Sequence, residues 1–492
     1  MNGTETAISQ WSFDMTDTVV IRAEPVLPDY CPDLQALVGT QAAVRIKERR
    51  IEPGKITVEG VCIFTELFYS EGEGRLRSLI HGQEFSHSFP VDRIPSGFTV
   101  TARVQEASGR LLQARKMAVT ASLILEVKGY ENKIVISPVE QPSLFLKAEK
   151  VNGMRVCAAN TRSFKLVEEM EIGEAEADIE EVLAADASVW VQETRMISEK
   201  AVLRGVAQVH LLYADENGAC RHLEKEVPFN QIVELEGAEE SCCVYASMDI
   251  TSLKVSVSIE GEKAARSLAA ALEIEAYARA CRNVELTLVT DAYATDSQLN
   301  MEKMPLSVCG VAPIQTVETS VKAEAEPGRE IIFAKADALI SDAHIEQQRL
   351  VICGSVEAEL IYRDVEGNYA IEKQITEFSV YPETANLGEE VRLDCEAVVQ
   401  RVSFTESGYE VNVGVGVQLN EVRDVETVVS VEKNGEAPAP CECQAYLYYM
   451  NGEDSLWEVA KRYRTSPEAV RRANGPLENE GTHRVLFVPV LK

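Results

Sequence analysis

The chain carries one stretch three times, and its first copy reads Lys55-Ile-Thr-Val-Glu-Gly60-Val-Cys-Ile-Phe-Thr-Glu-Leu-Phe68. The second copy is Lys200-Ala-Val-Leu-Arg-Gly205-Val-Ala-Gln-Val-His-Leu-Leu-Tyr213, and the third is Arg349-Leu-Val-Ile-Cys-Gly354-Ser-Val-Glu-Ala-Glu-Leu-Ile-Tyr362. The repeated glycines are 205 − 60 = 145 and 354 − 205 = 149 residues apart, and an aromatic residue follows each glycine by eight positions. A period of this length predicts three similar structural units.

Between its turns the chain alternates apolar and polar residues with a period of two, which indicates antiparallel strands with one buried face. Pro53-Gly54 and Glu366-Gly367 are typical of the turns that join such strands. A phenylalanine also recurs 17, 16 and 16 residues after the aromatic residue of each copy, at Phe85, Phe229 and Phe378. We predict a mainly β protein whose three repeated antiparallel β-sandwich-like units span 10–140, 160–300 and 312–432.

Each repeated glycine lies in the middle of an expected strand, which indicates either a β-bulge or a close packing contact. One stretch departs from the strand pattern, because Glu262 to Ala280 is rich in alanine. We expect part of that stretch to be an insertion or a helical excursion. Residues 433–444 contain Asn434-Gly435 and two prolines, and they predict an exposed linker before the C-terminal stretch 445–492.

The charge of the chain is strongly negative, with 79 acidic against 48 basic residues and a net charge of −31. The stretch 445–492 holds seven bases and six acids, so it carries +1 and the rest of the chain carries −32. A negative field of this size repels nucleic acids and anionic membranes. We therefore expect neither of them as a partner, and the acidity is most simply explained by solubility.

The sequence also bears on the compartment in which the protein works. The N-terminus has no basic start followed by an apolar segment, and no run of about 18 apolar residues predicts a membrane span. Twelve cysteines are scattered along the chain, some of them inside apolar strands, such as Cys62 and Cys353. This usage favours free thiols in a reducing compartment. We expect a cytoplasmic protein without membrane insertion.

The C-terminal stretch changes to a pattern of strand, helix, helix and strand. Its first strand is short and aromatic and ends at Asn451-Gly452. Ser455 and Glu458 have the spacing of a capping box, in which each side chain satisfies an amide that the first helical turn leaves unpaired. A second helix is expected to begin at Ser466-Pro467 and to end at Asn474-Gly475.

These residues resemble a LysM domain, a βααβ module best known for binding N-acetylglucosamine chains. The motifs that carry the resemblance are Gly452-Glu-Asp-Ser-Leu-Trp457, Ala460-Lys-Arg-Tyr463, Thr465-Ser-Pro467, Asn474 and Phe487-Val-Pro489. Many LysM domains have the glycine and the aspartate adjacent, whereas Glu453 separates them here. The resemblance covers about a tenth of the chain, and it leaves open whether the ligand is a glycan or a protein.

The resemblance implies a shallow groove between the loop after the first strand and the loop after the second helix. The partner- or glycan-binding residues that we expect on its rim are Gly452, Glu453, Asp454, Ser455, Trp457, Asn474, Leu477, Glu478 and Asn479. Ser455 is also explained as a helix cap, and Trp457 is equally compatible with a place in the core. The apolar residues expected in the core of the module are Leu456, Val459, Tyr463 and Phe487.

A second resemblance covers nearly the whole chain. Pro28-Asp-Tyr-Cys-Pro-Asp33, the following strand Val44-Arg-Ile46 and the first glycine block are similar to the SPOCS domain of clostridial spore proteins. Asp178-Ile-Glu180 and Ala336-Asp-Ala338 are the corresponding candidates in the second and third units. Tandem SPOCS-like units followed by a LysM domain resemble the SipL-type spore coat morphogenetic proteins.

The sequence lacks the motifs of an enzyme. Its six histidines are dispersed, and it has no His-Glu-x-x-His, no Gly-x-Ser-x-Gly, no Gly-x-Gly-x-x-Gly after a strand and no Gly-Lys-Ser/Thr phosphate loop. Acidic residues abound, but no motif indicates a glycosidase pair. Cys242-Cys243 and Cys441-x-Cys443 are the closest cysteine pairs, and without a second pair or a neighbouring histidine they are weak evidence for zinc. We predict no catalysis, no cofactor and no metal.

The resemblance to the SipL type implies a structural adaptor in the mother cell of a sporulating bacterium. Its LysM module would dock on the SpoIVA-type coat-basement ATPase, and its β units would contact further copies or other coat proteins. The alternative is a cell-envelope protein that binds peptidoglycan through the same module. The missing export signal and the many cysteines favour the adaptor.

Overall fold

The computed structural model describes residues 3–72, 74–173, 176–258, 266–347, 349–383, 391–405, 408–436, 443–450, 454–475 and 485–490. In these residues the chain forms 21 strands, β1 to β21, and two short helices, α1 and α2. The prediction of a mainly β protein is confirmed. The strands form small antiparallel sheets, and each of the three copies of the repeat is the central strand of one sheet.

The first unit consists of two three-stranded sheets around one core. One sheet has the order β1–β6–β5, with bounds Gly3–Ala23, Lys116–Pro138 and Gly97–Gln113. The other has the order β2–β3–β4, with bounds Leu34–Glu52, Lys55–Ser70 and Leu76–Pro90. Alternate residues of β3 and β6, such as Phe64 and Leu123, are fully buried between the sheets. The period of two in the sequence therefore directs one face of each strand into the core.

The second unit has the same arrangement. One sheet has the order β11–β12–β7, with bounds Cys243–Ser258, Ser267–Ala294 and Leu144–Glu171. The other has the order β10–β9–β8, with bounds Cys220–Glu234, Lys200–Asp215 and Ile179–Ile197. Val209 of β9 and Leu272 of β12 are fully buried in the core that the two sheets share.

The alanine-rich part of the second unit corrects one prediction. We expected part of 262–280 to be an insertion or a helical excursion, but the residues from Ser267 onward belong to β12. Along β12, alternate residues are fully buried: Leu268, Ala270, Leu272, Ile274, Ala276 and Ala278. Packing against two neighbouring strands outweighs the helical preference of alanine, which is a fraction of a kcal/mol per residue.

The third unit has the same arrangement of two facing sheets, with one added strand. The sheet β15–β16–β17 has bounds Glu330–Glu346, Arg349–Arg363 and Tyr369–Val380. The facing sheet is built on β19, Gly408–Glu436, which pairs with β14, Gln315–Glu324, with β18, Val391–Thr405, and with β13, Ser297–Cys309. Ile352 and Val413 are fully buried between these sheets.

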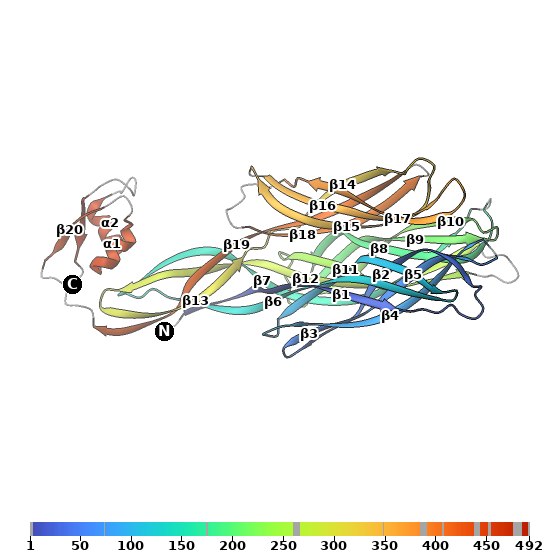
Figure 1. The fold of residues 1–492 in the computed structure, drawn as a ribbon. Coiled ribbons are helices and arrows are strands. Elements are labelled where there is room, and N and C mark those ends of the chain that lie inside the picture. Colours follow the sequence, from blue (N-terminus) through green and yellow to red (C-terminus); the bar gives the residue numbers. More distant parts are fainter. Residues whose placement is uncertain are drawn as a thin grey trace.

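Beyond the three units, long strand ribbons form a stalk (Figure 1). The stalk ribbons are β1 with the end of β6, the start of β7 with the end of β12, and β13 with the end of β19. Ile8, Val135, Leu286 and Val308 of these ribbons pack in a common buried cluster. The expected unit limits at 160 and 432 fall inside β7 and β19, because the same strands serve the head and the stalk. Residues 433–436 belong to β19 rather than to a linker, and 437–442 lie outside the described residues.

The three units pack against one another to form the head of the molecule. Leu67, Leu212 and Ile361 each lie seven residues after the repeated glycine, and all three are fully buried in one cluster between the units. Two tyrosines extend the contact: the Tyr369 backbone N–H donates to the Tyr69 hydroxyl at 2.6 Å, and the Cys220 N–H donates to the Tyr369 hydroxyl at 3.3 Å. The repeat therefore supplies both the core of each unit and the contact between units.

The C-terminal module contains β20, Ala445–Tyr449, α1, Leu456–Tyr463, α2, Pro467–Asn474, and β21, Val485–Pro489. β20 and β21 form an antiparallel pair. Figure 1 shows the module at the end of the stalk, remote from the head. Across the described residues, neither helix has the length and apolar character that a membrane crossing requires.

Candidate functional site

Both helices of the C-terminal module begin at caps that the sequence predicts. Ser455 accepts a hydrogen bond from the Glu458 N–H at 3.3 Å, and the Glu458 carboxylate accepts one from the Ser455 N–H at 3.1 Å. Ser466 caps α2 in a similar way, since its hydroxyl accepts from the Ala469 N–H at 2.9 Å. The predicted capping box and the second helix start are confirmed.

The core of the module lies between the two helices and the strand pair. Leu456, Val459, Val470, Leu486 and Val488 are buried there, and Tyr463 packs against them. The expectation that Phe487 belongs to this core is wrong, because 48% of this residue is exposed. Alternate residues of a strand point to opposite faces, and Leu486 and Val488 occupy the inner face.

Asn474 joins the end of α2 to β21. Its amide nitrogen donates to the Val470 carbonyl at 2.6 Å and to the Phe487 carbonyl at 2.8 Å, and its carbonyl oxygen accepts from the Phe487 N–H at 2.8 Å. The side chain therefore uses both of its polar atoms inside the module.

The expected groove is only partly within the described residues. Asp454 accepts a hydrogen bond from the Tyr448 hydroxyl at 2.8 Å, next to Ser455 at the helix start. The other rim residues that we predicted, Gly452, Glu453, Leu477, Glu478 and Asn479, lie outside the described residues. Their role in binding stays a prediction.

Trp457 faces the stalk. Its indole N–H donates to the Asp291 carboxylate at 2.8 Å, and the Lys461 ammonium, one helical turn further on, contacts both oxygens of the same carboxylate at 2.7 Å. Burial raises the pKa of Asp291, but the hydrogen bonds from Lys461 and Trp457 outweigh it and hold this pKa below its ordinary value. The carboxylate is thus ionised at neutral pH and binds α1 to β12.

Tyr293 completes this contact, which we call the stalk latch (Asp291 and Tyr293 with Trp457, Lys461 and Thr465). The Tyr293 hydroxyl donates to the Thr465 carbonyl at 2.6 Å in a buried position, and its ring lies edge-on to Trp457 with centroids 4.9 Å apart. We predicted neither of the two stalk residues from the sequence. Asp291 and Tyr293 end a strand more than 160 residues before α1, and no local motif marks them.

The opposite side of the module is an apolar face on the strand pair. Leu447 lies opposite Phe487, and Tyr449 lies opposite Val485. These four residues, which we call the outer apolar face, are 66%, 48%, 73% and 47% exposed in that order. Large apolar side chains grouped on one surface are typical of protein interaction sites.

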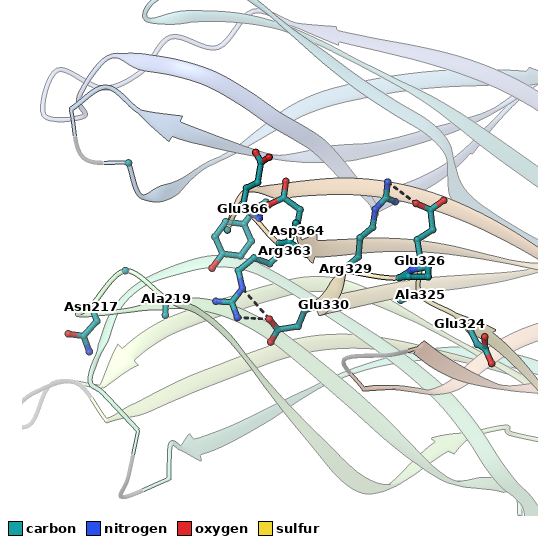
Figure 2. A pocket seen from close by; sticks show the side chains of 17 residues that line it. Asn217, Ala219, Glu324, Ala325, Glu326, Arg329, Glu330, Arg363, Asp364 and Glu366 are labelled. Atoms are coloured by element: carbon teal, nitrogen blue, oxygen red, sulfur yellow. Dashed lines mark hydrogen bonds and ion pairs between the residues drawn. The ribbon is translucent and has the colours of Figure 1, made fainter.

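At the end of the head opposite the stalk, a cavity of about 1180 Å³ opens between hairpin turns (Figure 2). It is lined by loop 324–330 and by the turns 217–219 and 363–367. Arg363 donates to Glu330 at 3.1 Å, and Arg329 pairs with Glu326 at 2.9 Å. The arginines of the cavity are neutralised by their own neighbours, so we assign it no ligand.

The loop that leads into β2 and the loop that leads into β8 are each held by an arginine in the same way. In the first unit, Arg115 binds Asp33 at 2.7 Å and the Pro28 carbonyl at 2.7 Å. In the second unit, Arg266 binds Asp178 at 2.9 Å and the Gly173 carbonyl at 2.7 Å. Asp178 is therefore the counterpart of Asp33, as the sequence indicated.

The candidate of the third unit is wrong. Asp337 lies inside β15, where it pairs with Glu357 of β16, and not in the loop that leads into the strand. Asp33 and Asp178 each lie 27 residues before the repeated glycine of their unit (60 − 33 and 205 − 178), whereas Asp337 lies 354 − 337 = 17 residues before Gly354.

Comparison with known proteins finds one similarity. Residues 178–258 match the family model described as SipL, SPOCS domain. The matched stretch has 258 − 178 + 1 = 81 of the 492 residues and begins at the clamped Asp178, then covers β8 to β11. No curated protein and no solved structure matches the chain. The similarity thus falls on the second unit, whereas the fuller sequence motif stands in the first.

Proposed function

We propose that this protein is a non-enzymatic adaptor in the assembly of the spore coat, at the forespore surface in the mother-cell cytosol. The observation that carries the proposal is the match of 178–258 to the SipL SPOCS domain, a domain of sporulation proteins. We extend this domain to the first and third units, because all three units share the same sheet orders around a repeated central strand. Three such units form a large interlocked head.

The C-terminal module, in this proposal, is a LysM domain that docks on the SpoIVA-type coat-basement ATPase. Its helix α1 is engaged by Asp291 and Tyr293, so the side of Trp457 is covered. The outer apolar face is on the free side of the module. We assign the protein partner to this face, because burying one large apolar side chain contributes about 1.5–3 kcal/mol to association. The predicted loop residues Glu453 and Leu477 would extend the contact.

The head would contact further copies of the chain or other coat proteins. Support for this comes from its exposed apolar residues, which include Val167 and Ile375 at 68% and 62% exposure. Both lie on strands at the margin of the head, β7 and β17.

A binding experiment with the full chain tests the proposal. The chain is incubated with a SpoIVA-type ATPase and, separately, with insoluble peptidoglycan. We expect capture of the ATPase, and we expect the double variant Tyr449→Ser, Phe487→Ser to lose at least tenfold in affinity, which corresponds to about 1.4 kcal/mol. Val365→Ser, a change at an exposed apolar residue in a turn of the head to which no partner is assigned, serves as the matched control and should leave this affinity unchanged.

The alternative function makes the opposite prediction. If the module were a peptidoglycan-binding LysM domain, the full chain would sediment with insoluble peptidoglycan and would not capture the ATPase. That result would refute the adaptor. Substitutions at Glu453 and Leu477 would then be tested for loss of glycan binding.

A further inference from the structure

Four cysteines gather where the second unit meets the stalk. They are Cys157 in β7, Cys242 just before β11, Cys243 in β11 and Cys281 in β12. All four are free thiols. Cys243 lies directly opposite Cys281 in the strand pair. Cys242 lies in the turn before β11, where its N–H donates to the Glu239 carbonyl, and it belongs to the buried cluster against which Cys157 packs.

Cys157 lies at a shift in the register of β7 against β12. In the pairing of β7 with β12, Ala158 lies opposite Ala280 and Val156 lies opposite Cys281. Cys157 is therefore the extra residue of a bulge, and a bulge turns a side chain out of the regular alternation. The Cys157 side chain packs against the buried cluster that contains Cys242.

The two thiols are near neighbours that differ in access. Burial raises the pKa of Cys157, and the charge of the adjacent Cys242 thiol and a side-chain hydrogen bond with it act in the same direction, so that this pKa lies at about 11. Arg282 and Arg155 act in the opposite direction. Cys157 is half-buried, whereas Cys242 is only 7% exposed. A small oxidant in solution therefore meets Cys157 first.

We propose that Cys157 and Cys242 form a reversible disulfide when the protein meets a peroxide. The Cys157 thiolate attacks one peroxide oxygen, so that an S–O bond forms, the O–O bond breaks and the leaving hydroxide becomes water. The Cys242 thiolate then attacks the sulfenic sulfur, so that the S–S bond forms, the S–O bond breaks and a second water leaves. Two thiols give two electrons to one peroxide molecule. High thiol pKa values make this reaction slow, because the thiolate is the nucleophile.

The disulfide would tie β7 to the turn before β11. It closes a loop of 242 − 157 = 85 residues, which contains the whole sheet β10–β9–β8. A crosslink over a loop of this length restricts the unfolded chain strongly. Oxidation therefore changes the second unit from a fold held by non-covalent contacts to one that is also held covalently.

Peptide mapping of the full chain tests the proposal. The protein is treated with hydrogen peroxide, the remaining thiols are alkylated, and the unreduced digest is analysed by mass spectrometry. We expect a peptide pair that links Cys157 to Cys242, a rise in the thermal unfolding midpoint, and reversal of both by dithiothreitol. A digest in which Cys157 is alkylated, or in which Cys243 is linked to Cys281 instead, would overturn the proposal.

Serine variants separate this pair from the other thiols. Cys157→Ser and Cys242→Ser should each abolish the linked peptide and the peroxide-dependent rise of the midpoint. Cys353→Ser, a change at a half-buried thiol of the third unit, should keep both. If Cys157→Ser retained the full rise, a different crosslink would be responsible and the proposal would fail.

Discussion

Gly205 lies in the centre of β9, directly opposite Phe229 of β10 and Val191 of β8. A Cβ atom at this position would come within 2.2 Å of the Trp190 carbonyl and 2.4 Å of the Phe229 ring. The register of β8 also shifts immediately after Val191. Gly60 and Gly354 have the same surroundings, with Phe85 and Phe378 across the strand. The glycine thus accommodates both a bulge in the neighbouring strand and an aromatic ring.

Gly205→Ala should therefore destabilise the protein. Overpacking of this kind costs about 1–3 kcal/mol of the free energy of unfolding, and a lower urea midpoint would show it. Gly416→Ala is the matched control, because Gly416 also lies inside a strand but its Cβ would meet the nearest atom only at 3.8 Å. Equal midpoints for the two variants would contradict the packing role.

His210 is a buried histidine on the same strand, with 4% of its surface exposed. Burial lowers its pKa, and His222 acts in the same direction, whereas Asp186 and Glu224 act against them. The folded protein therefore binds this proton at a lower pH than the unfolded chain does, in which the pKa of a histidine is about 6.5.

Acid should weaken the protein through His210. The contribution of neutral His210 to the free energy of unfolding is fully present above about pH 6.5. It is lost as the pH falls from there through the lower pKa of the folded protein, by at most about 1.4 kcal/mol per pH unit. His210→Gln should reduce the difference between the urea midpoints at pH 7.5 and pH 5. An unchanged difference would show that another group is responsible.

At the scale of single elements, the position of α1 depends on the stalk latch. A charge-assisted hydrogen bond contributes about 1.5–3 kcal/mol, and Asp291 makes such bonds with both Trp457 and Lys461. The capping box determines where α1 begins, but the latch determines which side of α1 is covered.

Asp291→Ala should release the C-terminal module from the stalk while its own core stays folded. With fluorotryptophan incorporated, each of the three tryptophans gives one fluorine resonance, and the resonance of Trp457 should move toward its solvent-exposed position. Glu285→Ala removes an exposed carboxylate from the same strand, where it pairs with Lys150, and should leave that resonance in place. An unshifted Trp457 signal in Asp291→Ala would contradict the latch.

At the scale of the whole molecule, the head is joined by a core that lies between units rather than inside one. Leu67, Leu212 and Ile361 are equivalent residues of the three copies, and none of them is exposed. Each unit thereby buries part of its outer sheet face against the other two, and separate units would expose this apolar surface to water.

Leu212→Ala should destabilise the head by about 2–5 kcal/mol, the usual cost of truncating a buried leucine. Because the cavity would lie between units, calorimetry should show a lower and broader transition. Ile232→Ala truncates a residue of the neighbouring strand β10 that is 40% exposed, and should cost less than about 1 kcal/mol. Similar losses for the two variants would argue against an inter-unit core.

The repeat and the local sequence patterns were sufficient to predict much of the fold. The period of two predicted the strands, the repeated glycines predicted three similar units, and Ser455 with Glu458 predicted the start of α1. These features depend on residues that are close in sequence or repeated in it, so their physical cause can be recognised in the sequence itself.

Other features depend on contacts between distant parts of the chain. The alanines of β12 form a strand because two neighbouring strands supply its hydrogen bonds and cover its face. Phe487 is exposed because Leu486 and Val488 fill the inner face, and Trp457 is covered because Asp291 lies next to it. The sequence alone determined the repeated β units and the caps of the C-terminal helices, since these rest on local alternation and local hydrogen bonds. Only the tertiary structure decided which side of the C-terminal module stays free, because that choice depends on a carboxylate and a tyrosine at the far end of a strand in another unit.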